Sequence, residues 1–172
     1  MKSFRGDRGV TLIELVIVLA IVCILAAIAI PAYVGSQKNA ERQEAYTNLQ
    51  NLRLLEEQLL AENGETTSQI ATYPATIGIA GQNQPGNIAL IQNGNGDATN
   101  ALPSFNPGIG TTLKFSYQIL QGQQIVIPVA KPPTYAAVAA GTPCYAIVAT
   151  GNPNSRVTGE VYAIDCYNTR NF

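Results

Sequence analysis

An apolar run of 21 residues near the start of the chain, Val10–Ile30, is interrupted only by Thr11 and Glu14. An α-helix needs about 20 apolar residues to cross a bilayer, so this run is long enough to span a membrane. The nine residues before it carry three cations and one anion. Because cations favour the cytoplasmic side of a membrane, we expect the N-terminus to stay there and the rest of the chain to be exported.

An ordinary secretory signal peptide is the competing interpretation, since a basic start, an apolar core and a small-residue site at Ala27-Ile28-Ala29 are all present. The apolar run, however, exceeds the roughly 7–15 residues of such a core. Glu14 also lies inside it, and an acid costs roughly 2.5–3.5 kcal/mol at the membrane centre and less near the edge. A carboxylate in such a place is expected to have a partner and a function.

The stretch GVTLIEL at Gly9–Leu15 resembles the cleavage and assembly motif of type IV prepilins. The resemblance implies that a membrane aspartyl peptidase cuts after Gly9 and that the new N-terminal residue, Val10, is N-methylated. Glu14 then becomes the fifth residue and pairs with the Val10 amine of a neighbouring subunit during assembly. Pro31 falls where pilins commonly carry a proline in the first helix. Val10 itself departs from the family pattern, in which phenylalanine is usual.

Apolar residues recur every three or four positions over residues 32–63, which predicts an amphipathic continuation of the helix. This apolar stripe consists of Ala45, Leu49, Leu52, Leu55 and Leu59. Charged residues occupy the other sides: Glu41, Arg42, Glu44, Arg53, Glu56 and Glu57. Asn63-Gly64 is a stop signal, and a helix from Thr11 to Glu62 would be about 75 Å long. Pro31 and Gly35 predict a kink or local melting. A coiled coil is the alternative partner arrangement, but the stripe is too short to favour it.

Residues 64–112 are rich in Gly, Asn, Gln, Thr and Pro, and Asp97 is the only charge between Glu65 and Lys114. No period is evident and turn signals recur, so a long irregular connection is expected. In pilins, the corresponding αβ-loop packs between subunits and shapes the filament surface.

Four strand-like runs follow within residues 113–172. They are Leu113–Leu120, Gln124–Val129, Cys144–Thr150 and Glu160–Cys166. We expect them to form an antiparallel meander that packs one face on the apolar stripe of the helix. The predicted fold class is therefore α+β, with a long N-terminal helix packed on a C-terminal antiparallel sheet of about four strands, as in type IV pilins.

Three cysteines are present, and Cys23 lies in the apolar run, where a thiol acts as a small apolar group. Cys144 opens one predicted strand and Cys166 closes another, so antiparallel pairing would place them at one end. Export to an oxidising compartment then favours a disulfide, worth on the order of 3 kcal/mol, over two free buried thiols. Pilins often carry such a C-terminal disulfide loop, exposed on the filament.

No residues were found that suit catalysis, a cofactor or a metal. The chain has no histidine, which removes the commonest general base and metal ligand. The segment Gln92–Asn100 offers oxygen ligands for calcium but only one carboxylate, Asp97. A net charge of −1 and a few scattered cations after Arg53 argue against nucleic-acid binding.

The sequence thus predicts a non-enzymatic subunit of a type IV pilus, found in the inner membrane before assembly and in an extracellular filament afterwards. Adhesion, motility or DNA uptake are its possible uses. The expected organisation is a cleaved leader at 1–9, a transmembrane and filament-core helix at 10–31, an amphipathic helix at 32–63, an αβ-loop at 64–112 and a sheet at 113–172. The implied partners are further copies of the chain, related minor pilins, a prepilin peptidase, an inner-membrane assembly platform and the membrane itself. A pseudopilin of a type II secretion system, or a secreted binding domain behind a signal peptide, are the alternatives.

Overall fold

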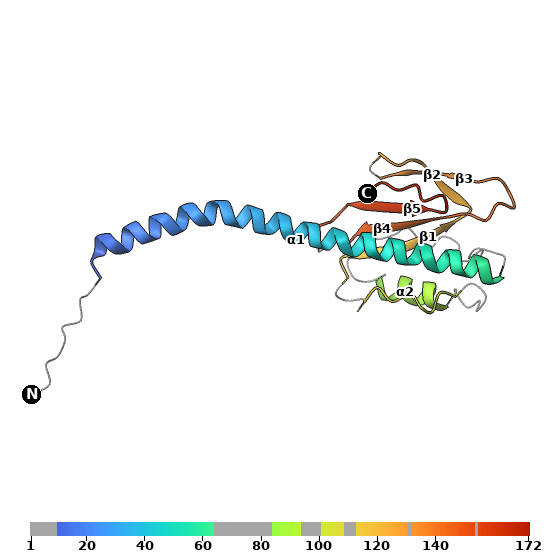
Figure 1. Ribbon diagram of the computed structural model, residues 1–172, viewed down its shortest axis with the longest axis horizontal. Helices are drawn as coiled ribbons and strands as arrows, with labels where there is room; N and C mark the ends of the chain where they lie inside the picture. Colours follow the sequence, from blue (N-terminus) through green and yellow to red (C-terminus); the bar gives the residue numbers. More distant parts are fainter. Residues whose placement is uncertain (1–9, 64–83, 94–100, 109–112, 131, 154) are drawn as a thin grey trace, which may run out of the picture. The chain divides into compact units, whose positions relative to one another are not determined.

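A computed structural model describes residues 10–63, 84–93, 101–108, 113–130, 132–153 and 155–172. The chain divides into two compact units, residues 1–39 and 40–172, and the first helix contributes to both. The elements are α1 (Leu12–Asn63), α2 (Gln84–Asn93), β1 (Phe115–Gln121), β2 (Gln123–Ile127), β3 (Thr134–Ala137), β4 (Tyr145–Gly151) and β5 (Val161–Asp165) (Figure 1).

The first unit consists of the apolar part of α1. Its large apolar side chains are exposed all round, with exposed fractions from 80% at Leu12 down to 46% at Val34, so the described residues of this unit build no core. The helix runs without interruption through Pro31. Local melting at that residue is therefore not found here, and a kink stays a prediction.

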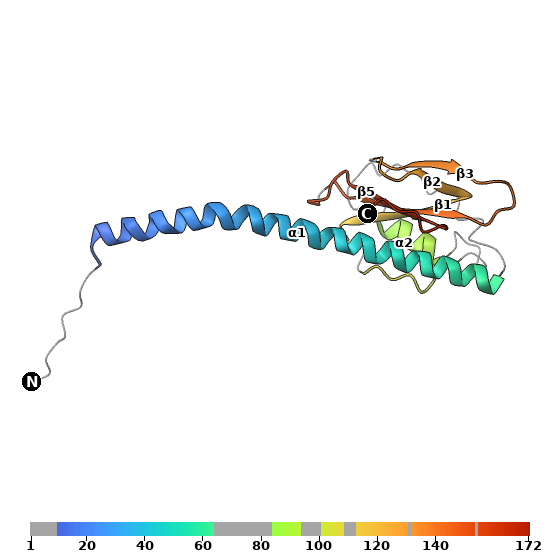
Figure 2. The ribbon, with the colours of Figure 1, turned by 45° about the horizontal axis from the view of Figure 1, so that its top comes forward.

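The second unit has three layers (Figures 1 and 2). A three-stranded antiparallel sheet with the order β1-β4-β5 lies in the middle. The later part of α1 and helix α2 pack on one face of this sheet, and the antiparallel β2–β3 hairpin packs on the other. Alternation along β4 explains the two faces, since Ile147 faces the helices whereas its neighbour Val148 faces the hairpin.

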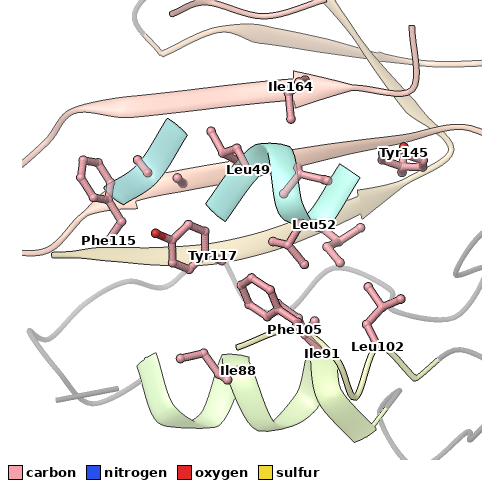
Figure 3. Close-up of a cluster of buried hydrophobic side chains, with 14 of the residues drawn as sticks. Leu49, Leu52, Ile88, Ile91, Leu102, Phe105, Phe115, Tyr117, Tyr145 and Ile164 are labelled. Atoms are coloured by element: carbon pink, nitrogen blue, oxygen red, sulfur yellow. The ribbon is translucent and has the colours of Figure 1, made fainter. Parts of the chain in front are cut away.

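The apolar stripe of α1 forms the centre of the core, as predicted. Leu49 and Leu52 are fully buried beneath the sheet and contact the aromatic layer that includes Phe105 and Tyr117 (Figure 3). The rings of Phe105 and Tyr117 meet edge to face at 5.7 Å. The buried Asn48 amide donates to the Tyr117 hydroxyl at 2.8 Å, so a polar residue next to the stripe also enters the core.

Two charged residues that we expected on the exposed sides of the helix lie inward instead. Glu56 is fully buried. Glu44 is half-buried, and its carboxylate accepts the Lys114 backbone N–H at 3.0 Å. The expectation failed because the sheet and the 101–108 segment wrap more than one helix face, which a stripe of leucines does not reveal.

Four expected strands are present, but the expected meander is wrong. The sheet joins β1 directly to β4, and β2 turns back to pair with a fifth strand, β3, that we did not predict. The sequence of β3, Thr-Tyr-Ala-Ala, is short and rich in alanine, which has low β propensity. Helix α2 was also missed, because it lies in a turn-like stretch and depends on Ile88 and Ile91 reaching the core.

The last residues of the chain cover the outer edge of β5. Ile164 and Arg170 form an isolated antiparallel bridge. The Asn171 side chain accepts the Ala163 N–H at 2.8 Å and donates to the Val161 carbonyl at 2.9 Å. This tail therefore satisfies the backbone groups that an edge strand would otherwise leave open.

Candidate assembly site

The start of α1 is organised by a reciprocal pair of hydrogen bonds between Thr11 and Glu14. The Thr11 backbone N–H and hydroxyl donate to Oε2 of Glu14 at 2.9 and 2.7 Å. In return, the Glu14 backbone N–H donates to the Thr11 hydroxyl oxygen at 3.3 Å. Thr11 thus occupies the N-cap position and Glu14 the third helical position, an arrangement known as a capping box.

Sequence reasoning assigned Glu14 to assembly and did not notice this local role. The signal was present, because Thr-x-x-Glu before an apolar run is the sequence signature of a capping box. Its consequence is that the Glu14 side chain is held at the helix start in one orientation.

The capping box leaves part of the Glu14 carboxylate available. Both hydrogen bonds from Thr11 end on Oε2, and among the described residues Oε1 accepts no hydrogen bond. Glu14 also sits in the first turn of α1, where the partial positive charge of the helix dipole favours an anion. The site can therefore take a cation at Oε1 without giving up the cap.

Val10, the expected first residue after cleavage, is 77% exposed and precedes the helix. Gly9, on the other side of the expected cut, lies outside the described residues. The chain at Val10 is therefore exposed and non-helical.

The surroundings of Glu14 are apolar and uncovered. Helix α1 is long and apolar enough to cross a membrane, and its most apolar 18-residue window has a mean hydropathy of 3.2 with none of it buried. Each Val, Leu or Ile left in water forfeits about 1.5–3 kcal/mol relative to burial. Water is therefore an unfavourable environment for this segment.

The two later cysteines are joined at one end of the sheet. Cys144 directly precedes β4, Cys166 directly follows β5, and the two form a disulfide with their Cα atoms 5.3 Å apart. The Cys166 N–H also donates to the Tyr145 carbonyl at 3.0 Å, which extends the β4–β5 ladder to the bridge. Cys23 is free and exposed on the apolar part of α1.

Next to this bridge, the fully buried Asp165 organises the turn that follows β5. Its carboxylate accepts the backbone N–H groups of Tyr167 and Thr169 at 3.0 and 2.8 Å. The other oxygen accepts the Ile125 N–H at 2.9 Å, so the same side chain ties the β2–β3 hairpin to the central sheet. No sequence signal pointed to this role, because an aspartate at a strand end reads as an ordinary turn residue.

Most of the expected αβ-loop, including Asp97, lies outside the described residues. Within the described part of the chain, no group of three or more His, Cys, Asp or Glu side chains comes together as a metal site would require.

Comparison with known families identifies the N-terminal segment. The family model for the prokaryotic N-terminal methylation motif matches residues 4–30, a range that includes the Gly9–Val10 junction and Glu14.

Curated relatives match longer stretches. The type IV major pilin protein PilA of Myxococcus xanthus is 48% identical over 56 residues, which cover 33% of this chain and 26% of that protein. The type IV major pilin protein PilE1 of Neisseria gonorrhoeae is 40% identical over 83 residues, or 48% of this chain and 32% of that protein. The type IV wide pilus major component PilA4 of Thermus thermophilus is 34% identical over 86 residues, or 50% of this chain and 63% of that protein. The chain thus spans between 26% and 63% of the length of these relatives. No solved structure matches the chain.

Proposed function

We propose that this chain, which is similar to type IV major pilins over its N-terminal part, is the structural subunit of a type IV pilus. It is exported, cleaved between Gly9 and Val10, N-methylated on Val10 and polymerised through the apolar part of α1. Before assembly it is anchored in the inner membrane, and after assembly it is part of an extracellular filament.

One observation carries this proposal: the first part of α1, residues 12–30, is apolar on every side and uncovered, and its single carboxylate, Glu14, lies at its start. In a single subunit, lipid keeps these apolar side chains out of water. In a filament core, other copies of the helix can do the same. Polymerisation then exchanges one apolar environment for another, so that the transfer exposes little apolar surface to water.

The charge at Glu14 supplies the registry that apolar packing lacks. Apolar contacts are non-directional, so helices could slide along one another with little change in free energy. Cleavage after Gly9 would create a cationic amine at Val10, and the open Oε1 of Glu14 in a neighbouring subunit can accept it. Leaving one member of a buried pair unpaired costs about 3–5 kcal/mol, which disfavours every register but one.

The partners follow from this scheme. The uncut chain requires a prepilin peptidase in the membrane, and extraction of the helix from lipid requires an inner-membrane assembly platform that supplies work. Related minor pilins would join the filament through the same helix.

Processing is tested on the mature protein by intact mass and N-terminal sequencing of purified filaments. A start at Val10, with one added methyl group, supports the proposal. A start near Ile30 or Ala32 would show an ordinary signal peptide and refute it.

Assembly is tested by separating the charge of Glu14 from its capping role. Glu14→Gln keeps a side-chain oxygen for Thr11, since glutamine also serves in a capping box, but removes the charge. The loss of a paired charge should lower subunit addition by more than about a hundredfold, and no filaments should be seen by electron microscopy. Thr11→Ala is the matched control, because it costs about 1 kcal/mol of capping and leaves the charge in place.

Normal filaments from Glu14→Gln would defeat the registry argument. Surface filaments from the native chain distinguish a pilus from the short periplasmic piston of a secretion pseudopilin, for which the same processing is expected.

A further inference from the structure

The β2–β3 hairpin ends in a strand, β3, whose outer edge pairs with no other strand in the part of the chain that the structure describes. The N–H of Val138, just beyond β3, donates to the Gly122 carbonyl across the hairpin at 2.9 Å. Opposite Tyr135, the Ile125 N–H points away from β3 and reaches Asp165. Because successive residues of a strand turn their backbone groups to opposite edges, the N–H and C=O groups of Tyr135 and Ala137 face away from β2. Among the described residues, no hydrogen bond to these groups is found.

This edge differs from the edge of β5 in the same unit. The C-terminal tail covers β5, where Asn171 bonds both the Ala163 N–H and the Val161 carbonyl. Natural proteins usually protect an edge by such a cover, by a bulge, or by a charged residue or proline within the strand. Strand β3 contains neither a charged residue nor a proline, since its residues are Thr-Tyr-Ala-Ala, and the register irregularity of this hairpin lies in β2, between Ile125 and Ile127. Both Thr134 and Ala137, at its ends, are exposed.

The sequence around β3 suits contact with an identical copy. Between Lys114 and Arg156 the chain carries one charge, Lys131, which lies outside the described residues. At a two-fold axis, identical residues of the two copies lie opposite each other. A charged residue there would face a like charge, which is destabilising, whereas an uncharged residue avoids this repulsion. Beyond Tyr135, residues 136–141 are Ala-Ala-Val-Ala-Ala-Gly, whose small side chains let a second backbone approach.

We propose that β3 is a self-association edge that pairs antiparallel with β3 of a second copy. The two-fold axis passes between the two Ala136 residues, and Tyr135 of each copy lies opposite Ala137 of the other. Each of these two residue pairs exchanges two N–H···O bonds, so every open backbone group of the edge is satisfied. Pro132 and Pro133 stop the pairing from extending before Thr134, because proline has no N–H to donate.

In a pilus, this contact would join neighbouring filaments side by side. This role of the contact rests on the proposed function. Growth of a helical filament needs head-to-tail contacts, whereas a two-fold contact closes after two copies and cannot propagate along one filament. Many weak β3 contacts between two long filaments would add up through multivalency, so that filaments associate in bundles.

A cross-linking experiment on the detergent-solubilised full chain tests the pairing without filaments. Cys23→Ser removes the free thiol, and Ala136→Cys places a thiol at the proposed axis, where facing Cβ atoms of such a pair lie about 4.5–5.5 Å apart. We expect mild oxidation to give a covalent dimer on a non-reducing gel. Ala140→Cys in the same background is the matched control, because Ala140 is exposed but lies in the turn beyond the edge.

A proline variant tests the backbone bonds directly. Ala137→Pro removes one outward N–H and should abolish both the Ala136→Cys dimer and the bundling of purified filaments. Ala140→Pro is its control: Ala140 is the second residue of a turn closed by the Thr142 N–H and the Ala139 carbonyl at 3.0 Å, with Gly141 at φ 82°, and proline is favoured there. Ala140→Pro should therefore leave dimer and bundles unchanged. Circular dichroism confirms that both variants fold.

Equal cross-linking at positions 136 and 140, or bundles from folded Ala137→Pro filaments, would overturn the proposal. The outcome is independent of polymerisation, because Glu14→Gln subunits should still form the Ala136→Cys dimer. Loss of filaments with retention of the dimer, or the reverse, shows which of the two proposals fails.

Discussion

Replacing Gly151 by alanine should lower the free energy of unfolding of the second unit by more than a conservative change in an exposed loop would. Gly151 ends β4, and its N–H donates to the Glu160 carbonyl at 2.8 Å across the β4–β5 connection. A Cβ atom built on Gly151 would lie 1.9 Å from the Val157 carbonyl oxygen and 2.7 Å from its carbon. Both atoms belong to the backbone, so no side-chain rotation can make room.

The size of the effect follows from what must move. A carbon and a carbonyl oxygen approach to about 3.3 Å at the closest, so the two chain segments must separate by well over 1 Å. That shift breaks the Gly151–Glu160 bond and strains the Glu160 N–H bond to the Val157 carbonyl, which is 3.0 Å long. Each lost bond lowers the free energy of unfolding by about 1 kcal/mol, and a buried group left unpaired costs about 1–3 kcal/mol. We expect Gly151→Ala to lower the free energy of unfolding by about 2–4 kcal/mol.

Thermal unfolding of the detergent-solubilised full chain, followed by circular dichroism, measures this loss. At roughly 3–5 °C per kcal/mol for a domain of this size, the midpoint should fall by about 10 °C. Gly35→Ala is the matched control, since its Cβ would meet nothing within 4 Å and alanine is the better helix former. A Gly151→Ala midpoint within about 1 °C of the native value would refute the backbone-clash argument.

Three further changes test the core, the bridge and a buried charge by the same assay. Leu52→Ala should lower the free energy of unfolding by about 2–5 kcal/mol, because Leu52 is fully buried and its truncation leaves a cavity. A decrease below about 1 kcal/mol would mean that the helix does not pack on the sheet. Replacing Cys144 and Cys166 by serine together should lose about 3 kcal/mol by the loop-entropy account, with the reduced native protein as control. Burial raises the pKa of Glu44, so the folded state binds its proton more tightly, and stability falls as pH rises from the unfolded value of about 4.3 through the folded pKa. Glu44→Gln should therefore gain stability relative to the native chain at pH 7 and little at pH 4, and an equal gain at both would contradict this reasoning.

Periodicity carried most of what could be predicted. The apolar run and the stripe from Ala45 to Leu59 identified both parts of α1, because a helix places residues three and four apart on one face whatever surrounds it. Of the four strand-like runs, Leu113–Leu120 was found by its alternation and the others by their β-rich or apolar composition between turn signals, which are also local properties.

Helix α2 and strand β3 escaped prediction because their own residues have little preference for the structure they adopt. Residues Ile88 and Ile91 stabilise α2 only by entering a core built from α1 and the sheet. Strand β2 turns back at Gly122 and pairs with β3, which leaves the place beside the central strand β4 to β1. Which strands pair depends on loop geometry and on the packing of both sheet faces. Neither can be predicted from the residues of a single segment.

By itself, the sequence determined the apolar helix with one acid at its start, the motif around Gly9 and the pairing potential of two cysteines near the end. Each of these depends on residues close together in the chain or on a pattern that repeats along it. Only the tertiary structure decided that Glu56 and Asp165 are buried, that the tail covers the edge of β5, and that no described residue bonds to the outer edge of β3. Those features depend on which distant segments satisfy one another's hydrogen bonds, and that is settled by packing in three dimensions.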